Sequence, residues 1–362
     1  MKEEVSHQLS SLDWIYLHRC LSLAKLGSTK VFPNPQVGAV IVHQNRIIGE
    51  GFHSYAGGPH AEIAALQSVK QQDLLPHSTM YVSLEPCSHH GRTPPCASAI
   101  IQHRIPHVVI GCLDPNPQVS GNGLCRLQEA GIQVQVASDT TAFKSLNKAF
   151  FVNQRFRRPW ISLKWAESAD GFIAGLGANR HPIRTPISGA VSKIWVHKLR
   201  AQSQTIMIGR HTAIIDNPSL TTRHYYGEHP TRIIFDKHLQ LPSHLALFTD
   251  GIPTIILNQH KQEQVQHIQY YIPQQWEQME LLMKELYGEL GICNILVEGG
   301  RNLLQQFLDQ DIWDELWRFQ GPSDLKSGIA APSIHGDWEW SNQRVGEDSL
   351  SFVSRNHHLS ST

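Results

Sequence analysis

The sequence predicts two domains, each a layered α/β structure. A chain of 362 residues exceeds the usual size of one hydrophobic core, and its 41% apolar residues can fill two. On both sides of residue 152, strand-like apolar runs alternate with helical stretches. Such alternation is typical of sheets covered by helices. We therefore expect one domain over residues 1–151 and a second over residues 152–362.

The first domain is expected to open with a helix. From Asp13 to Ala24, apolar residues recur every three or four positions, which predicts an amphipathic helix that ends near Gly27. The strands predicted after it are residues 37–42, 46–51, 79–85 and 107–112, and the helices between them are residues 60–69 and 96–104.

A polar, basic stretch at residues 152–159, VNQRFRRP, is the predicted linker. The elements expected beyond it are residues 160–166, 191–202, 205–209, 231–236, 252–258, 292–298 and a helix at 301–310. The polar segment after Ser333 carries no recognisable element.

The overall charge and the cysteine usage restrict the classes of function. Lys plus Arg (31) equals Asp plus Glu (31), so no long-range field favours nucleic acid or an anionic membrane, and a small-molecule ligand fits better. The six cysteines are too sparse for a secreted disulfide scaffold and are expected to be reduced. The N-terminus has neither a signal-peptide nor a membrane-span pattern, which predicts a cytoplasmic protein.

One constellation in the first domain predicts a metal centre. Zinc that activates water takes three nitrogen or thiolate ligands and keeps one position open, and His60, Cys87 and Cys96 supply that set. Glu62, two residues after His60, fits the proton shuttle of a deamination. Zinc nucleobase deaminases carry H-x-E followed by P-C-x-x-C, but here eight residues separate the cysteines. Taken singly, each residue has a packing role as its alternative.

The second domain carries a candidate phosphate-binding turn. It lacks the G-x-G-x-x-G of an ordinary dinucleotide-binding turn. In NILVEGGRNLL, an apolar run ends at Glu298, and Gly299 and Gly300 allow a close turn into a helix whose free N–H groups favour phosphate. A plain strand-to-helix turn is the alternative.

Several strings of the first domain resemble the bifunctional deaminase/reductase family of riboflavin biosynthesis: PNPQVGAVIV, PHAE, CSHHGRTPPC, DPNPQVSGNGL and LNKAFF. The resemblance implies a cytidine-deaminase-like α-β-α domain that uses Zn2+ to remove the 2-amino group of 2,5-diamino-6-(5-phosphoribosylamino)pyrimidin-4-one. Asn34 is then a candidate for the pyrimidine edge and Arg92 for the phosphate. A turn residue and a surface charge are their alternatives.

The second domain resembles the reductase half of the same family in SLKWAESADGFIA, LRAQSQTIMIGRHTAIIDNPSLTTR and VEGG. This resemblance implies a dihydrofolate-reductase-like fold, NADPH as cofactor and a homo-oligomer. Carried over by position, the cofactor residues are Thr212, Asp216, Gly299, Gly300 and Arg301. The substrate residues are Arg200, Leu220, Arg223 and Glu298, and for Arg200 and Arg223, taken singly, a surface role is the alternative. Lys164 and Asp170 are candidates for proton transfer, with a strand-end salt bridge as the alternative.

One departure from the family lies at RTPISG, where Arg184 and Pro186 occupy the places of a serine and a tryptophan. A proline offers no aromatic face to a cofactor. We therefore expect cofactor affinity or substrate specificity to differ from that of the family. Two other readings stay open. One is a cytidine or tRNA adenosine deaminase with an unrelated second domain, and the other is a zinc-stabilised protein that binds a nucleotide without turning it over.

Overall fold

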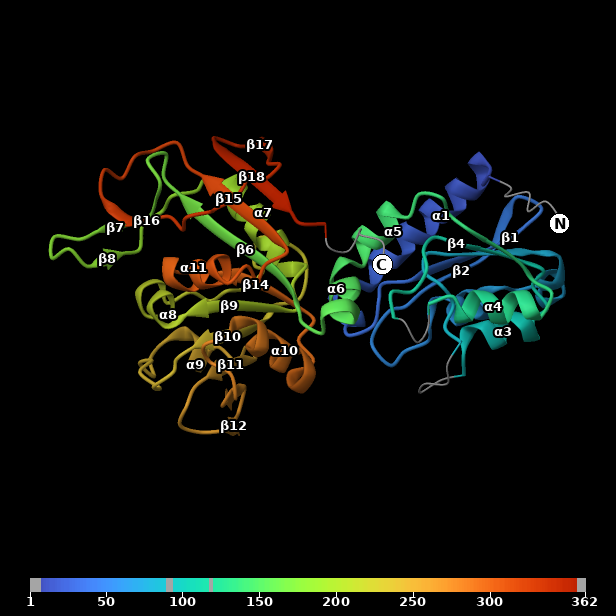
Figure 1. The fold of residues 1–362 in the computed structure, drawn as a ribbon, viewed down its shortest axis with the longest axis horizontal. Coiled ribbons are helices and arrows are strands. Elements are labelled where there is room, and N and C mark those ends of the chain that lie inside the picture. The colour runs from blue at the N-terminus through green and yellow to red at the C-terminus, as the bar shows by residue number, and fades with distance from the viewer. Residues whose placement is uncertain (1–7, 89–93, 117–119, 357–362) are drawn as a thin grey trace. The chain divides into compact units, whose positions relative to one another are not determined.

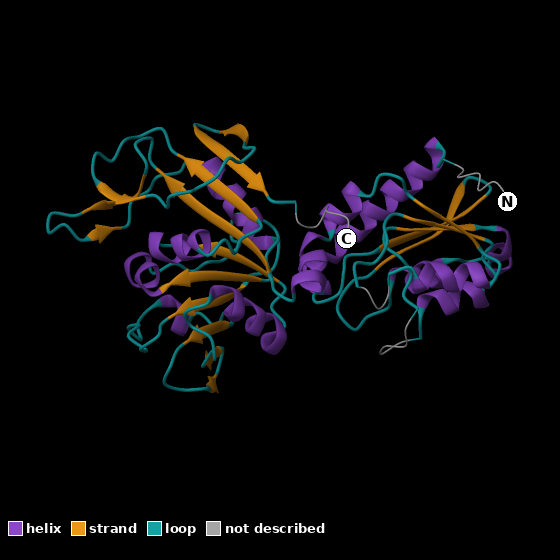
Figure 2. Cartoon of the chain, viewed as in Figure 1, coloured by secondary structure: helices purple, strands orange, loops and turns teal. Residues whose placement is uncertain are grey.

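The computed structural model describes residues 8–88, 94–116 and 120–356 (Figure 1). These residues form two compact units, of which the first ends at Phe156 and the second begins at Arg157. In each unit, helices cover a central sheet (Figure 2). Among the described residues, no helix combines the length and the apolar character needed to cross a membrane.

The first unit is built on a five-stranded sheet of order β2-β1-β3-β4-β5. Its strands are β1 (Gly38–His43), β2 (Arg46–Phe52), β3 (Thr79–Val82), β4 (His107–Ile110) and β5 (Gln133–Val136). β1 is antiparallel to β2 and β3, whereas β3, β4 and β5 are parallel. Ala39 and Ile41 belong to one core cluster and Val40 and Val42 to the other, so β1 is buried on both faces.

Two helical layers enclose this sheet. The layer that contributes to one core cluster is α2 (Ala61–Ser68), α3 (Cys96–Gln102) and α4 (Asn122–Glu129). The opposite layer is α1 (Ser11–Ala24), α5 (Thr141–Leu146) and α6 (Lys148–Phe156), and two 3-10 helices, η1 (Lys25–Val31) and η2 (Gln72–His77), lie between strands and helices. A capping box between Ser10 and Asp13 starts α1. The α-β-α layering of this domain is therefore confirmed.

The expected linker is wrong for residues 152–156, which continue α6. Phe150 and Phe151 on this helix pack into the core of the first unit, and Val152 is fully buried. The burial of these apolar side chains stabilises the helix despite the polar and basic residues that follow. The expected domain boundary after residue 151 lies inside this helix.

The second unit contains a ten-stranded sheet of order β12-β13-β11-β10-β9-β14-β6-β15-β18-β17. The strands are β6 (Trp160–Glu167), β9 (Thr205–Gly209), β10 (Thr231–Phe235), β11 (Thr254–Leu257), β12 (Glu263–Val265), β13 (Ile268–Tyr271), β14 (Asn294–Glu298), β15 (Glu315–Gln320), β17 (Ser341–Val345) and β18 (Asp348–Ser354). From β13 to β15 neighbouring strands are parallel, and β12, β17 and β18 add antiparallel pairs at the two edges. β17 and β18 come from the segment after Ser333, where the sequence predicted no element.

Helices again cover both faces of this sheet. The helices of one face are α10 (Met279–Leu290) and α11 (Arg301–Asp309), and those of the other are α7 (Ala190–Ala201), α8 (Arg210–Asp216) and α9 (Ala246–Thr249). A small separate sheet has the order β16-β7-β8, with β16 (Gly328–Ala330), β7 (Phe172–Leu176) and β8 (Pro182–Ile183). The mixed α/β class expected for the second domain is confirmed.

A buried ion pair ties the entry of the second unit to the start of β15. Arg158 donates from both terminal nitrogens to Asp314, at 2.6 and 2.9 Å, and the Asp314 side chain is fully buried. The same carboxylate accepts the backbone N–H of Ile161 at 2.8 Å. The first strand of this unit is therefore held in place by a charge that lies 156 residues away from Arg158 in sequence.

We expect Asp314→Asn to destabilise the second unit by about 3–5 kcal/mol, because it leaves the Arg158 guanidinium buried without a counter-charge. Urea unfolding followed by tryptophan fluorescence measures the change. Asp337→Asn, at an exposed position, is the matched control and should shift stability by less than about 0.5 kcal/mol. Equal stability of the two variants would contradict the role given to this ion pair.

Candidate metal centre and nucleotide site

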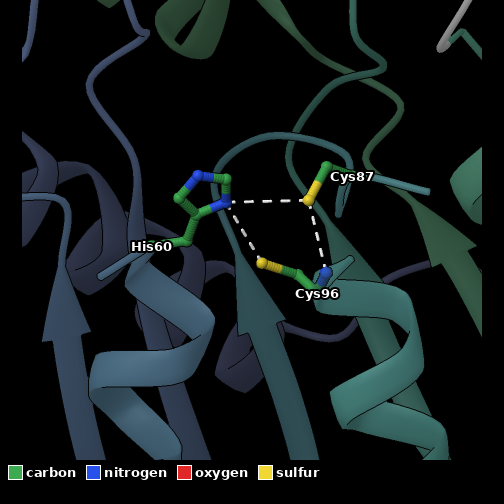
Figure 3. Close-up of side chains that lie close together, drawn as sticks. All are labelled: His60, Cys87 and Cys96. Carbon is green, nitrogen blue, oxygen red and sulfur yellow. Dashed lines mark hydrogen bonds between the residues drawn. The ribbon is translucent and has the colours of Figure 1, made fainter. Parts of the chain in front are cut away.

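Three segments bring the predicted metal ligands together. His60 immediately precedes α2, Cys87 follows β3, and Cys96 is the first residue of α3. His60 Nδ1 lies 3.6 Å from Cys87 Sγ and 3.2 Å from Cys96 Sγ (Figure 3). All three ligand atoms lie within 4.8 Å of one another.

The spacing of these atoms fits zinc. Tetrahedral bonds of about 2.0 Å to nitrogen and 2.3 Å to sulfur place neighbouring ligand atoms roughly 3.5–3.8 Å apart. The backbone N–H of Cys96 donates to Cys87 Sγ at 3.2 Å. Hydrogen bonding from the Cys96 thiol, aided by His60, lowers the pKa of Cys87, which favours the thiolate that a metal requires. Three donors leave a fourth position for a reactant.

Glu62 lies in the first turn of α2 and is buried, with 4% of its surface exposed. Burial, reinforced by the charge of Cys87, raises the pKa of its carboxyl to about 7. A carboxyl with such a pKa can both accept and release a proton near neutral pH, as a proton shuttle must.

The two predicted substrate residues of this unit differ in what the structure describes. Asn34 Nδ2 lies 3.0 Å from His53 Nε2, and the His53 ring packs edge-on against His60 with 5.5 Å between ring centroids. Asn34 therefore lies in the layer of side chains next to the metal ligands. Arg92 lies outside the described residues.

In the second unit, Glu298 is the centre of a buried cluster of charges. Arg200 donates from Nε and Nη2 to its two carboxylate oxygens, each at 2.8 Å, and Lys164 Nζ lies 3.9 Å away. Burial alone would raise the pKa of Glu298, but the charges of Arg200 and Lys164 outweigh it and lower the pKa to about 2. Burial also lowers the pKa of Lys164. Asp170, the other candidate for proton transfer, instead accepts the backbone N–H groups of residues 325 and 326.

Arg200 also connects this cluster to the segment that carries the other predicted substrate residues. Its Nη1 donates to the carbonyl of Thr221 at 3.2 Å. Leu220 is buried in the core and has a φ of 56°, whereas the Arg223 side chain is exposed and donates to Ser219 Oγ at 2.8 Å. The structure thus places Glu298, Arg200 and the segment from Leu220 to Arg223 side by side.

Four of the five predicted cofactor residues lie where β14 turns into α11: Gly299, Gly300, Arg301 and Thr212. A Cβ on Gly300 would lie 3.1 Å from Thr212 Oγ1, so a side chain would crowd this turn. Among the residues that the structure describes, no side chain caps α11, which favours phosphate binding by the N–H groups at its start, beginning with Arg301. Asp216 ends α8, where burial raises its pKa and the charge of Arg184 opposes that rise. The substituted RTPISG segment therefore lies close to Asp216.

The sequence did not point to a cavity of about 360 Å³ beside this turn. It is lined by the ends of β9 and β10, by the segment before α10 and by the first turns of α8 and α11. Its wall carries two basic and two acidic side chains together with aromatic rings: Arg210, Lys237, Asp236, Glu277, Phe235 and Trp276. The only sequence signal was a pair of basic residues after an apolar run.

His197 on α7 was also missed. It is buried, and its Nδ1 has no hydrogen-bond partner among the described residues. Its ring packs edge-on against the ring of His224, with 4.6 Å between the ring centroids. His224 is the residue that follows Arg223. Burial and the charge of Arg200 lower its pKa to about 4, so its imidazole is neutral at physiological pH.

Two family models match the chain, one in each unit. The cytidine and deoxycytidylate deaminase zinc-binding region matches residues 11–112, and the RibD C-terminal domain matches residues 159–325. The first match contains all three predicted metal ligands and Glu62. The second contains every predicted residue of the reductase half.

Similar proteins cover nearly the whole chain. The riboflavin biosynthesis protein RibD of Aquifex aeolicus is 37% identical over 89% of this chain and 90% of its own length, and that of Escherichia coli is 37% identical over 87% and 89%. The crystal structure of a diaminohydroxyphosphoribosylaminopyrimidine deaminase/5-amino-6-(5-phosphoribosylamino)uracil reductase from Thermotoga maritima, 32% identical, superimposes with a TM-score of 0.84 over 95% of this chain and 98% of that one. Acinetobacter baumannii RibD, 28% identical, gives a TM-score of 0.80 with the same coverage. The chain therefore belongs to the RibD family of riboflavin biosynthesis proteins.

Proposed function

We propose that this chain catalyses two consecutive steps of riboflavin biosynthesis. The first is zinc-dependent hydrolytic deamination of 2,5-diamino-6-(5-phosphoribosylamino)pyrimidin-4-one, and the second is NADPH-dependent reduction of the ribosyl group to ribityl. The observation that carries the proposal is the cluster of His60, Cys87 and Cys96 beside the buried carboxyl of Glu62, in a chain that also has a RibD reductase domain.

In the deaminase unit, His60 and the two cysteines would hold the metal. When bound, zinc supplies the Lewis acidity that makes water nucleophilic near neutral pH. Glu62 takes one proton from the attacking water and passes it to the ring nitrogen, and it then carries the second proton, from the added hydroxyl group, to the amine that leaves as ammonia. A raised pKa suits a carboxyl that must accept and release protons in turn. Asn34, held next to His53, is placed to orient the pyrimidine edge.

In the reductase unit, Gly299, Gly300 and the uncapped start of α11 would bind a cofactor phosphate, and Thr212 borders the same turn. When bound, NADPH supplies the hydride. Glu298 stays ionised beside Arg200 and suits the hydroxyl groups of a sugar. Arg223, on the exposed side of its segment, is the candidate for the substrate phosphate. Lys164, whose pKa is lowered by burial, is the candidate proton donor.

Two finer assignments accompany this proposal. A cytoplasmic location is supported by the six free cysteines, two of which would serve as metal ligands. A homo-oligomer stays a prediction from the family. A cytidine or tRNA adenosine deaminase is not favoured, because the match to RibD extends through the second unit as well as the first.

A coupled assay tests the proposed function directly. Purified protein loaded with zinc is given the diaminopyrimidine ribosyl phosphate, and ammonia release is followed, then the loss of NADPH absorbance. We expect both signals in that order. Removing zinc with a chelator should abolish ammonia release but leave NADPH oxidation on the already deaminated substrate. Ammonia release from cytidine or tRNA, but not from the diaminopyrimidine, would overturn the proposal.

Glu62→Gln should lower the rate of ammonia release about 10²–10⁴-fold, because glutamine cannot carry the transferred proton. Zinc content should be unchanged, since Glu62 is not placed as a ligand. Reductase activity of the same variant, measured on the deaminated substrate, is the internal control for folding. Full deaminase turnover in this variant would show that another group moves the proton.

Lys237→Ala tests whether the cavity beside α11 receives the cofactor. We expect its cation to face the phosphate that distinguishes NADPH from NADH, so the substitution should weaken NADPH binding about tenfold, or about 1.4 kcal/mol, at low salt. Fluorescence titration with NADPH measures the change, and Lys193→Ala on the exposed face of α7 is the matched control. If both variants bind NADPH equally well, the cofactor phosphate lies elsewhere.

A further inference from the structure

Glu85 is a buried carboxylate that neither the metal centre nor the reductase site uses. It lies two residues before Cys87 and is 4% exposed. Its Oε1 accepts the backbone N–H groups of Gly123 (2.9 Å) and Leu124 (3.2 Å), and its Oε2 accepts those of Gly121 (3.0 Å) and Asp114 (3.2 Å). One side chain thus binds both the segment that follows β4, at Asp114, and the start of α4.

The helix held by Glu85 lies directly against the segment that presents Cys87. A Cβ on Gly123 would come within 2.1 Å of the Pro86 carbonyl oxygen, so α4 approaches that peptide as closely as glycine permits. Arg126, one turn further along α4, donates from Nη1 to the carbonyl of Ser88 at 3.0 Å. Helix α4 therefore contacts the residues immediately before and after Cys87 in sequence.

The other side of this segment is held by α3. Ala97 N–H donates to the Cys87 carbonyl at 3.1 Å, and Cys96 N–H donates to Cys87 Sγ. Figure 1 shows α3 and α4 next to each other on one face of the sheet, and the two helices are in contact. The backbone of Cys87 is thus clamped between α3 and a helix whose own position depends on Glu85.

The four donors require a carboxylate. A glutamate side chain offers two acceptor oxygens, one to each pair of donors, and N–H groups in the first turn of a helix carry the partial positive charge of the helix end. Glutamine has the same shape but would turn an NH2 group toward one pair of these donors. The substitution of glutamine for Glu85 would leave buried N–H groups without a hydrogen-bond acceptor. We expect α4 to move so that these groups find other partners.

We propose that Glu85 is a positioning residue for the metal ligand Cys87. By fixing the start of α4, it fixes Pro86 and Ser88 and thereby the direction of the Cys87 thiolate. The proposal rests on the proposed function in that it takes zinc as the bound metal. Residues that orient metal ligands typically change metal affinity 10–100-fold when they are replaced.

The test is zinc affinity of the full chain, measured by competition with a chromophoric chelator at a temperature where circular dichroism finds each protein folded. Glu85→Gln should weaken zinc binding 10–100-fold. NADPH oxidation on the deaminated substrate, a reaction of the other unit, should remain at the wild-type rate. Glu129→Gln, at the exposed end of α4, is the matched control and should bind zinc as tightly as the wild type.

A second variant keeps the proposal testable if Glu85→Gln does not fold. Arg126→Met removes the bond from α4 to Ser88 and leaves Glu85 intact, and it should also weaken zinc binding, by a smaller factor. If both variants keep wild-type zinc affinity, even with lowered melting temperature, Glu85 serves only the fold and the proposal is overturned. If the wild type itself binds no zinc, the proposed function fails instead.

Discussion

Both units depend on one geometric constraint: strands that run in the same direction end at the same edge of a sheet. In the first unit, β2 and β3 are both antiparallel to β1 and hence run the same way, so His60 and Cys87 follow strands that end together. β4, parallel to β3, leads to the loop that Glu85 binds. In the second unit, the parallel strands β9, β10 and β14 end beside the cavity and the glycine turn.

Three buried glutamates show how surroundings decide what one side-chain type does. Glu298 faces two cations and stays ionised, with a pKa of about 2. Glu62 has no cation of this kind paired with it among the described residues, and burial, reinforced by the charge of Cys87, raises its pKa to about 7, which allows proton exchange. Glu85 is surrounded by backbone N–H groups, which make it an anchor. Burial raises the pKa of both Glu62 and Glu298, and only at Glu298 do neighbouring cations reverse that rise, so the chemistry of each carboxyl follows from burial and partners together.

The sequence was most informative where chemistry resides in short local motifs. His60 and Glu62 share one helical turn and Cys87 follows a strand, so the metal centre could be predicted residue by residue. The contacts of Glu85 and the place of Lys237 in the cavity wall could not, because they involve segments distant in sequence. β17 was missed because four of its five residues are exposed and lack apolar alternation. The prediction of a linker at residues 152–156 was wrong because these residues continue α6, whose Phe150 and Phe151 side chains pack into the core.

The place of β6 in its sheet bears on how the chain acquires its structure during synthesis. β6 is the first strand of the second unit, yet it lies between β14 and β15, which leave the ribosome more than 120 residues later. The first unit completes its sheet within residues 38–136 and can close its core while translation continues. In the second unit, β6 pairs with strands that follow it by more than 120 residues, and such long sequence separations slow folding.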